Sequence, residues 1–133
     1  MPAFARTIGI DYSGAETPTA SVKGLRVYMT VNGEPPIEVL PPPSQRKYWT
    51  RKGVAEWLLE RLNENVSTLV SIDHGFSFPL RYFEAHDLKR NWSDFLDDFQ
   101  RHWPTDGDHT YVDFVREGAV GYGASRAGNA RWR

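Results

Sequence analysis

The sequence predicts one α/β domain: a mixed sheet, with strands numbered in chain order lying 3-2-1-4-5, and flanking helices. Three observations predict this class. A short strand-like run ends at an aspartate, an alternating run leads into a hairpin turn, and an amphipathic segment precedes an apolar run that ends at a second aspartate. With 133 residues, 40% of them hydrophobic, the chain is long enough to bury one core but not two.

The first part of the chain predicts three strands. Residues 7–10 form a short strand-like run that ends at Asp11. Residues 25–31 alternate between apolar and polar side chains, as in a half-buried strand. Asn32-Gly33 follows directly, and because both residues tolerate positive φ it is a favoured hairpin turn. The returning strand, 37–40, lies between prolines that lack amide donors, so we expect it at a sheet edge.

A helix and a fourth strand come next. Residues 50–64 show apolar side chains at helical spacing, with Thr50 as the expected N-cap. Its expected buried stripe consists of Val54, Trp57, Leu58 and Leu62. Residues 67–72 form a continuous apolar run, typical of a central strand covered on both faces, and end at Asp73. The helix is then a crossover connection, and parallel pairing of the first and fourth strands makes Asp11 and Asp73 neighbours.

The remaining chain predicts two helices, a fifth strand and a tail. Pro79 suits the first position of a helix that reaches residue 85 or 88. A second helix, 93–103, would bury Phe95, Leu96, Phe99 and Trp103 and turn Asp94, Asp97 and Asp98 mainly outward. Alternation over 110–115 predicts the fifth strand. Residues 118–133 are rich in glycine, and we expect a flexible or extended tail there.

Composition excludes several classes of function. Sixteen basic and 17 acidic residues give a net charge of -1, so no global field attracts nucleic acid, and any such contact must be local. The chain has no cysteine, which excludes disulfides, thiol nucleophiles and thiolate zinc sites. No apolar run approaches the roughly 18 residues of a membrane span, and no secretory signal is recognisable. We therefore expect a soluble, cytoplasmic protein without a membrane partner.

The order of these elements resembles that of the ribonuclease H fold. That fold normally ends with a further helix, and no such helix is predicted in this chain. Two motifs sharpen the resemblance: Gly9-Ile10-Asp11-Tyr12-Ser13-Gly14 and Ser71-Ile72-Asp73-His74-Gly75. More narrowly, residues 5–120 resemble an uncharacterised family of predicted nucleases with this fold. The resemblance implies metal-dependent hydrolysis of nucleic-acid phosphodiesters.

The two aspartates suit that chemistry. Phosphodiester cleavage by two metals needs ions about 3.5 to 4 Å apart, held by carboxylates, and Mg²⁺ or Mn²⁺ prefers such oxygen ligands. Asp11 would bridge and Asp73 would complete the site, both acting as catalytic metal ligands. Alternatively, both are ordinary turn or cap residues after a strand. His74 could act as a general base, metal ligand or phosphate partner, or it could be a loop histidine bonded to a backbone carbonyl.

A third carboxylate is harder to assign. Projection of the 50–64 helix places Glu56 and Glu60 opposite its apolar stripe, facing solvent. Asp113 is a candidate metal ligand on the fifth strand, but it would equally fit an exposed edge position. No Asp or Glu follows Glu117, so a carboxylate from a final helix is missing. The site would then be incomplete, either because the domain is truncated or because the scaffold lacks full activity.

Possible substrate contacts lie in two loops. Residues 46–52 interleave cations and aromatics around a helix N-terminus, with Lys47, Trp49 and Arg51 as candidate ligands of phosphates and stacked bases. The alternative is a solvated loop with Trp49 in the core. Ser13 is a further substrate-contact candidate or a turn-forming hydroxyl. Arginines near the C-terminus make the tail locally basic.

Two other functions compete with a nuclease. The first is a catalytically silent interaction module with the ribonuclease H fold, favoured by the missing carboxylate. The second is a fragment of an actin-like phosphotransferase, because the loops after Asp11 and Asp73 resemble the phosphate loops of that class, although those enzymes need a second lobe. The expected partners are nucleic acid and, if a missing final helix leaves apolar sheet surface exposed, a second copy of the chain.

Overall fold

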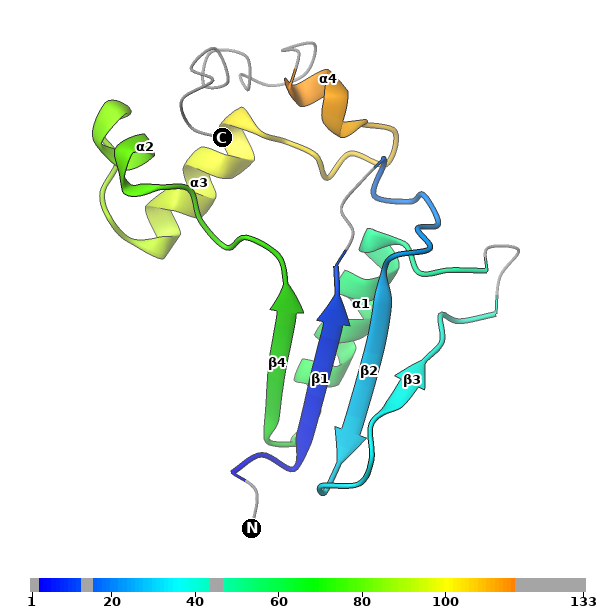
Figure 1. Cartoon of the computed structure of the whole chain (residues 1–133). Coiled ribbons are helices and arrows are strands. Elements are labelled where there is room, and N and C mark those ends of the chain that lie inside the picture. The colour runs from blue at the N-terminus through cyan, green and yellow to red at the C-terminus, as the bar shows by residue number, and fades with distance from the viewer. Residues whose placement is uncertain (1–2, 13–15, 44–46, 117–133) are drawn as a thin grey trace. The chain divides into compact units, whose positions relative to one another are not determined.

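The computed structural model describes residues 3–12, 16–43 and 47–116 (Figure 1). The backbone divides into two compact units, Met1–His74 and Gly75–Arg133. The first unit contains a sheet and one helix, and the second contains three helices among its described residues. Ser13 and the predicted tail, 118–133, lie outside the described residues.

The first unit is built on a mixed four-stranded sheet. Its strands are β1 (Arg6–Asp11), β2 (Arg26–Val31), β3 (Ile37–Val39) and β4 (Thr68–Asp73). They lie in the order β3-β2-β1-β4, with β1 parallel to β4 and antiparallel to β2. The helix α1 (Arg51–Leu62) covers one face of this sheet (Figure 1). The predicted α/β class, the hairpin and the crossover helix are confirmed.

A tight turn follows β2 and starts the connection to β3, where Met29 lies opposite Ile37. Asn32 and Gly33 have φ of 52° and 79°, and the Glu34 amide donates to the Val31 carbonyl over 3.0 Å. Positive φ at both central positions matches the right-handed twist of the flanking strands. The short strand β3 occupies the edge of the sheet, as the neighbouring prolines predict.

The crossover helix α1 begins at a side-chain cap. The Thr50 hydroxyl accepts a hydrogen bond of 2.9 Å from the Gly53 amide, which confirms Thr50 as the N-cap. Val54 is buried and contributes to the core. Leu62 is 50% exposed, so the predicted buried stripe is wrong at its last member, which lies in the final turn of the helix.

The core of the first unit lies between α1 and the sheet. Its buried members are Ile8, Ile10, Leu25, Val27, Trp49 and Val54. Because Ile8 and Ile10 face α1, the residues that alternate with them on β1, Thr7, Gly9 and Asp11, face the other way. A buried arginine lies on the same face as Ile8 and Ile10, at the start of β1. Arg6 is 6% exposed and donates to Glu64, to Thr68 Oγ1 over 3.1 Å and to the Arg61 carbonyl.

The strand β4 differs from the prediction of a strand covered on both faces. Its residues alternate between half-buried and exposed, and Leu69 is 45% exposed. Within the described sheet β4 is an edge strand, and α1 covers only one of its faces. The apolar run 67–72 therefore predicts the strand correctly but overestimates its burial.

The second unit contains α2 (Leu80–Ala85), α3 (Trp92–His102) and α4 (Val112–Arg116). Aromatic side chains pack α2 against α3. The centre of the Phe78 ring lies 4.8 Å from the ring centre of Tyr82, 5.5 Å from that of Phe95 and 6.0 Å from that of Trp103. Pro79 is the N-cap of α2 rather than its first helical residue.

Two expectations for α3 are wrong. Asp98 is buried rather than outward, and Leu96 is 43% exposed rather than buried. The buried face of α3 is thus rotated toward Asp98, which receives a hydrogen bond from α2. A polar residue with a buried partner violates the simple rule that places aspartates outside.

The predicted fifth strand is also wrong, and with it the order 3-2-1-4-5. Residues 112–116 form α4, and the sheet has four strands in the part of the chain that the structure describes. The rings of Tyr111 and Phe114 meet at 5.4 Å, and the Phe114 amide donates to the Tyr111 carbonyl over 3.0 Å. Six alternating residues are too few to separate a strand from a helical turn whose side chains meet at a spacing of three.

Candidate functional site

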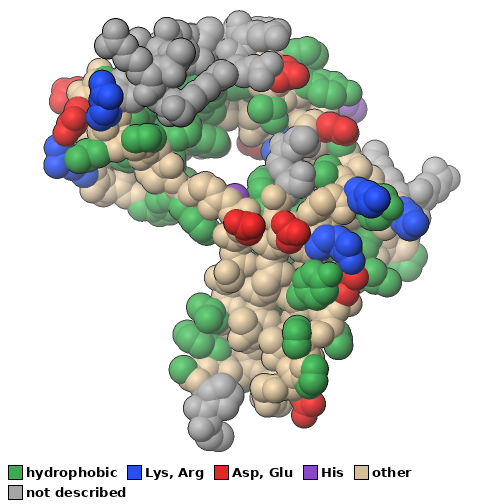
Figure 2. Space-filling model, in the orientation of Figure 1, with side chains coloured by type: hydrophobic (Ala, Val, Ile, Leu, Met, Phe, Trp, Pro, Cys, Tyr) green, Lys and Arg blue, Asp and Glu red, His purple; other side chains and the backbone are tan. Residues whose placement is uncertain are grey.

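The two aspartates lie side by side at the carboxyl ends of β1 and β4. Asp11 and Asp73 are register partners in the parallel pair, and adjacent strands lie about 4.8 Å apart. Both side chains are exposed and project from the sheet face opposite α1. Figure 2 shows acidic side chains gathered at this end of the sheet. The predicted juxtaposition of the carboxylates is present.

The residues that follow each aspartate also meet. The ring centres of Tyr12 and His74 lie 5.0 Å apart, and the two ring planes are tilted by 59°. Tyr12 packs against the core, whereas His74 is exposed and its amide donates to the Ile72 carbonyl over 3.1 Å. The parallel arrangement therefore continues one residue beyond the strands, and it places an imidazole next to the carboxylate pair.

A cation that sequence reasoning missed lies on the same face. Arg26 is the register partner of Asp11 on β2 and forms a two-pronged ion pair with Glu38 of β3, with Nη2 donating to Oε2 over 2.7 Å. The hydrogen bond with Glu38, more than the charge of Asp11, raises the pKa of Arg26, and the same bond lowers the pKa of Glu38. Alternation along 25–31 could have placed Arg26 on the Asp11 face, but not its partner.

The predicted substrate-contact residues of the 46–52 loop have contacts of their own. Trp49 is 3% exposed, and its indole N–H donates to the Val39 carbonyl over 2.8 Å, so it serves the core. Arg51 donates to the Glu16 carbonyl over 3.2 Å, and Lys47 is exposed with its ammonium 5.5 Å from the Tyr48 ring. The ring of Trp49 is therefore unavailable for stacking on a base.

The carboxylate pair has no third ligand among the described residues. No group of three or more histidine, aspartate or glutamate side chains there is arranged to hold a metal ion. Asp113 lies in α4 of the second unit and is exposed, and the strand that was expected to carry it is not formed. Glu56 and Glu60 are exposed on α1, as the helical projection predicts.

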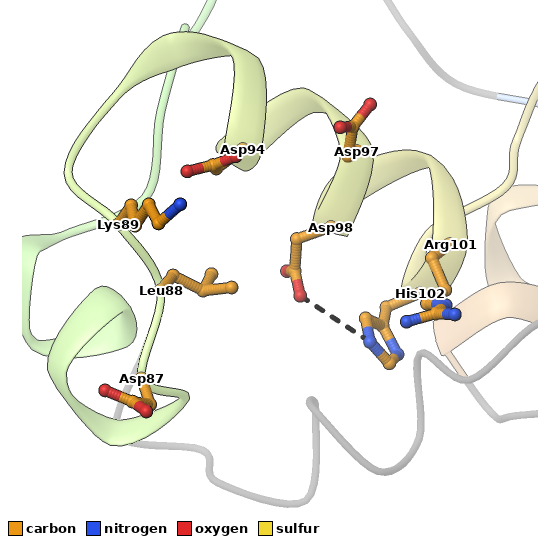
Figure 3. Close-up of a pocket in the computed structure, with 8 residues that line it drawn as sticks. All are labelled: Asp87, Leu88, Lys89, Asp94, Asp97, Asp98, Arg101 and His102. Atoms are coloured by element: carbon orange, nitrogen blue, oxygen red, sulfur yellow. Dashed lines mark ion pairs between the residues drawn. The ribbon is translucent and has the colours of Figure 1, made fainter.

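A second polar cluster lies in a hollow of about 560 Å³ in the second unit (Figure 3). Asp98 is 7% exposed; Oδ2 accepts from the Tyr82 hydroxyl over 2.7 Å, and Oδ1 lies 3.5 Å from His102 Nε2. Figure 3 shows Asp98 and His102 facing each other from successive turns of α3. Both carboxylate oxygens are thus engaged, and the hydrogen bond from Tyr82 links α2 to α3. The four-residue spacing of Asp98 and His102 was the available sequence signal.

The carboxylate pair can do chemistry that the second cluster cannot. Its oxygens are exposed and are hard donors, which fit Mg²⁺ or Mn²⁺, and Mg²⁺ commonly binds one or two protein carboxylates while water and substrate phosphates fill its other positions. Asp11 and Asp73 would hold such an ion.

No match was found among family models, curated proteins or solved structures. Among the described residues, no helix is long and apolar enough to cross a membrane.

Proposed function

We propose that this chain is a metal-dependent nuclease-like protein of the ribonuclease H class, which hydrolyses nucleic-acid phosphodiesters with Mg²⁺ or Mn²⁺ in the cytoplasm. The observation that carries the proposal is the in-register pairing of Asp11 with Asp73 at the ends of two parallel strands. Two exposed like charges at adjacent positions of a sheet cost stability, so a cation that binds them offsets a cost already present in the fold.

The roles of the side chains follow from their positions. A bound divalent ion would polarise the phosphodiester and lower the pKa of a water ligand. Asp11, on the central strand, and Asp73, its register partner, would together hold the ion. His74 lies beside the pair and is a candidate to accept the proton of the attacking water. The proposal rests on Asp11 and Asp73 alone.

Cleavage assays test this function. Wild type is incubated with labelled single-stranded and duplex oligonucleotides in Mg²⁺ or Mn²⁺, beside Asp11→Asn, Asp73→Asn and the control Glu34→Gln, which changes an exposed acid in the hairpin turn. We expect cleavage by wild type and the control, and a loss of about 100-fold or more in each aspartate variant. Equal cleavage by wild type and the aspartate variants would reject the site.

A catalytically silent interaction module is the second candidate. The observation that favours it is that the described residues supply two carboxylates and no third metal ligand. A protein of this kind would bind no divalent ion at Asp11 and Asp73 and would cleave neither oligonucleotide. Calorimetric titration of Mn²⁺ into wild type and the Asp11→Asn, Asp73→Asn double variant separates the two functions, because only the nuclease proposal requires heat that the double variant lacks.

A further inference from the structure

The sheet face that carries the aspartates has a gap next to them. Two residues before Asp11, Gly9 lies in the middle of β1, with Tyr28 of β2 and Ser71 of β4 as its register partners. We call Tyr28, Gly9 and Ser71 the glycine row. It runs across the sheet directly beside the row formed by Arg26, Asp11 and Asp73.

Neither the backbone nor the packing requires glycine at position 9. Its φ is not in the left-handed region, since Gly33 is the glycine with positive φ among the described residues. A Cβ built on Gly9 would meet nothing within 4 Å. Glycine weakens the interior of a strand, and it is retained there where another group approaches the backbone closely. The missing side chain therefore indicates space for a ligand.

The neighbours of this gap suit a nucleotide. Tyr28, the register partner of Gly9 on β2, is 39% exposed and carries an aromatic ring. The Arg26 guanidinium lies 6.0 Å from the centre of that ring and is held by Glu38. Ser71, on the other side, is exposed and carries a hydroxyl. An aromatic face beside a fixed guanidinium is a combination that binds a base and its phosphate.

We propose that the glycine row binds one unstacked base of a single-stranded nucleic acid, with Tyr28 beside the base and Arg26 on an adjacent phosphate. This inference rests on the proposed function, because the strand would be placed with its phosphodiester at Asp11 and Asp73. It also names the substrate class. A base inside a duplex is stacked on both faces and paired at its edge, so it cannot lie against both the sheet backbone and Tyr28.

Filling the gap tests the inference. Gly9→Val places a side chain in the open space at Gly9. Ala55→Val is its control, since Ala55 is an exposed position of α1 on the other side of the sheet. Binding of a single-stranded oligonucleotide is measured by anisotropy in Ca²⁺, with Mn²⁺ affinity measured separately by calorimetry. We expect Gly9→Val to weaken oligonucleotide binding about tenfold or more, while its denaturation midpoint and Mn²⁺ affinity do not fall.

A second pair of variants tests the stacking itself. The oligonucleotide carries the fluorescent adenine analogue aminopurine, whose emission is quenched when it stacks. Tyr28→Phe keeps the ring and should keep the quench, whereas Tyr28→Ala should lose it. Arg26→Gln should weaken binding and reduce its dependence on salt, because one phosphate contact is lost.

The outcomes separate this inference from the proposed function. Unchanged oligonucleotide binding by Gly9→Val, or equal affinity for single strand and duplex, overturns the glycine row even if Mn²⁺ binds and the substrate is cleaved. Absence of Mn²⁺ binding in wild type removes the nuclease proposal, but single-strand binding that Gly9→Val weakens would still support the row. A wild type that binds no oligonucleotide overturns the inference.

Discussion

Asp11 and Asp73 place two negative charges on adjacent positions of neighbouring strands. Like charges opposite each other destabilise a sheet, so Asp73→Asn should raise the free energy of unfolding by about 0.2–1 kcal/mol in the presence of a chelator. Added Mg²⁺ should then stabilise wild type but not the variant. Urea denaturation measures both effects, with Glu34→Gln as the control. A metal-free variant less stable than wild type would contradict this account of the pair.

Glu64 makes the stability of the first unit depend on pH. The hydrogen bond from Arg6 lowers the pKa of Glu64 below its ordinary value of 4.5. A lowered folded-state pKa contributes stability that is present above the unfolded-state pKa and is lost as pH falls through the folded-state pKa. Wild type should therefore lose stability between about pH 5 and pH 3, and Glu64→Gln should lose less.

The measurement is urea denaturation across that pH range. Glu38, whose pKa is lowered by Arg26, contributes a dependence of the same sign, so the slope should decrease in Glu64→Gln rather than vanish. Glu34→Gln should keep the wild-type slope. Superimposable pH profiles for wild type and Glu64→Gln would show that the Arg6 ion pair adds nothing to the pH dependence.

The helix α1 depends on its first turn. Thr50→Ala removes the acceptor of the Gly53 amide and should cost about 1 kcal/mol of unfolding free energy, whereas Thr50→Ser keeps the cap. Gly53 itself is constrained, because a Cβ there would lie 2.9 Å from Thr50 Oγ1. Thermal and urea denaturation of the two Thr50 variants checks the prediction. Equal losses for alanine and serine would mean that the hydroxyl is not the cap.

The helices α2 and α3 are joined by the hydrogen bond from Tyr82 to Asp98. Tyr82→Phe removes a donor to a buried carboxylate and should cost about 1–3 kcal/mol. Tyr111 is 49% exposed, so Tyr111→Phe is the matched control and should be nearly neutral. Chemical denaturation followed by tryptophan fluorescence measures both. A neutral Tyr82→Phe would show that the carboxylate gains little from this hydroxyl.

Local signals explain which elements could be predicted from sequence. The hairpin follows from two residues that tolerate positive φ, and α1 from a cap followed by apolar residues at helical spacing. The exposure of Leu69 could not be predicted, because an apolar run does not say how many layers cover a strand. The segment 110–115 is short enough to fit both the two-residue period of a strand and the helical period, and α4 forms there instead of a strand.

The candidate site was predictable to the extent that it depends on topology. Crossover connections order the strands, and this ordering brings Asp11 beside Asp73. Arg26 and Glu38 were missed as a pair because their contact depends on the register of β2 with β3, which is one residue out of the register that a two-residue Asn32-Gly33 turn gives. Trp49 lies in a loop with several cations, and only the packing shows that its ring belongs to the core.

At the scale of the whole molecule, the central claim is that one divalent-ion site exists, at the carboxyl ends of β1 and β4. The most direct measurement is a titration of isotope-labelled protein with substoichiometric Mn²⁺, followed by backbone NMR spectra, because the paramagnetic ion broadens nearby amide signals. We predict selective broadening of residues around Asp11 and Asp73, abolished in the Asp11→Asn, Asp73→Asn double variant. Broadening centred on another group of acids, or none at all, would contradict the account.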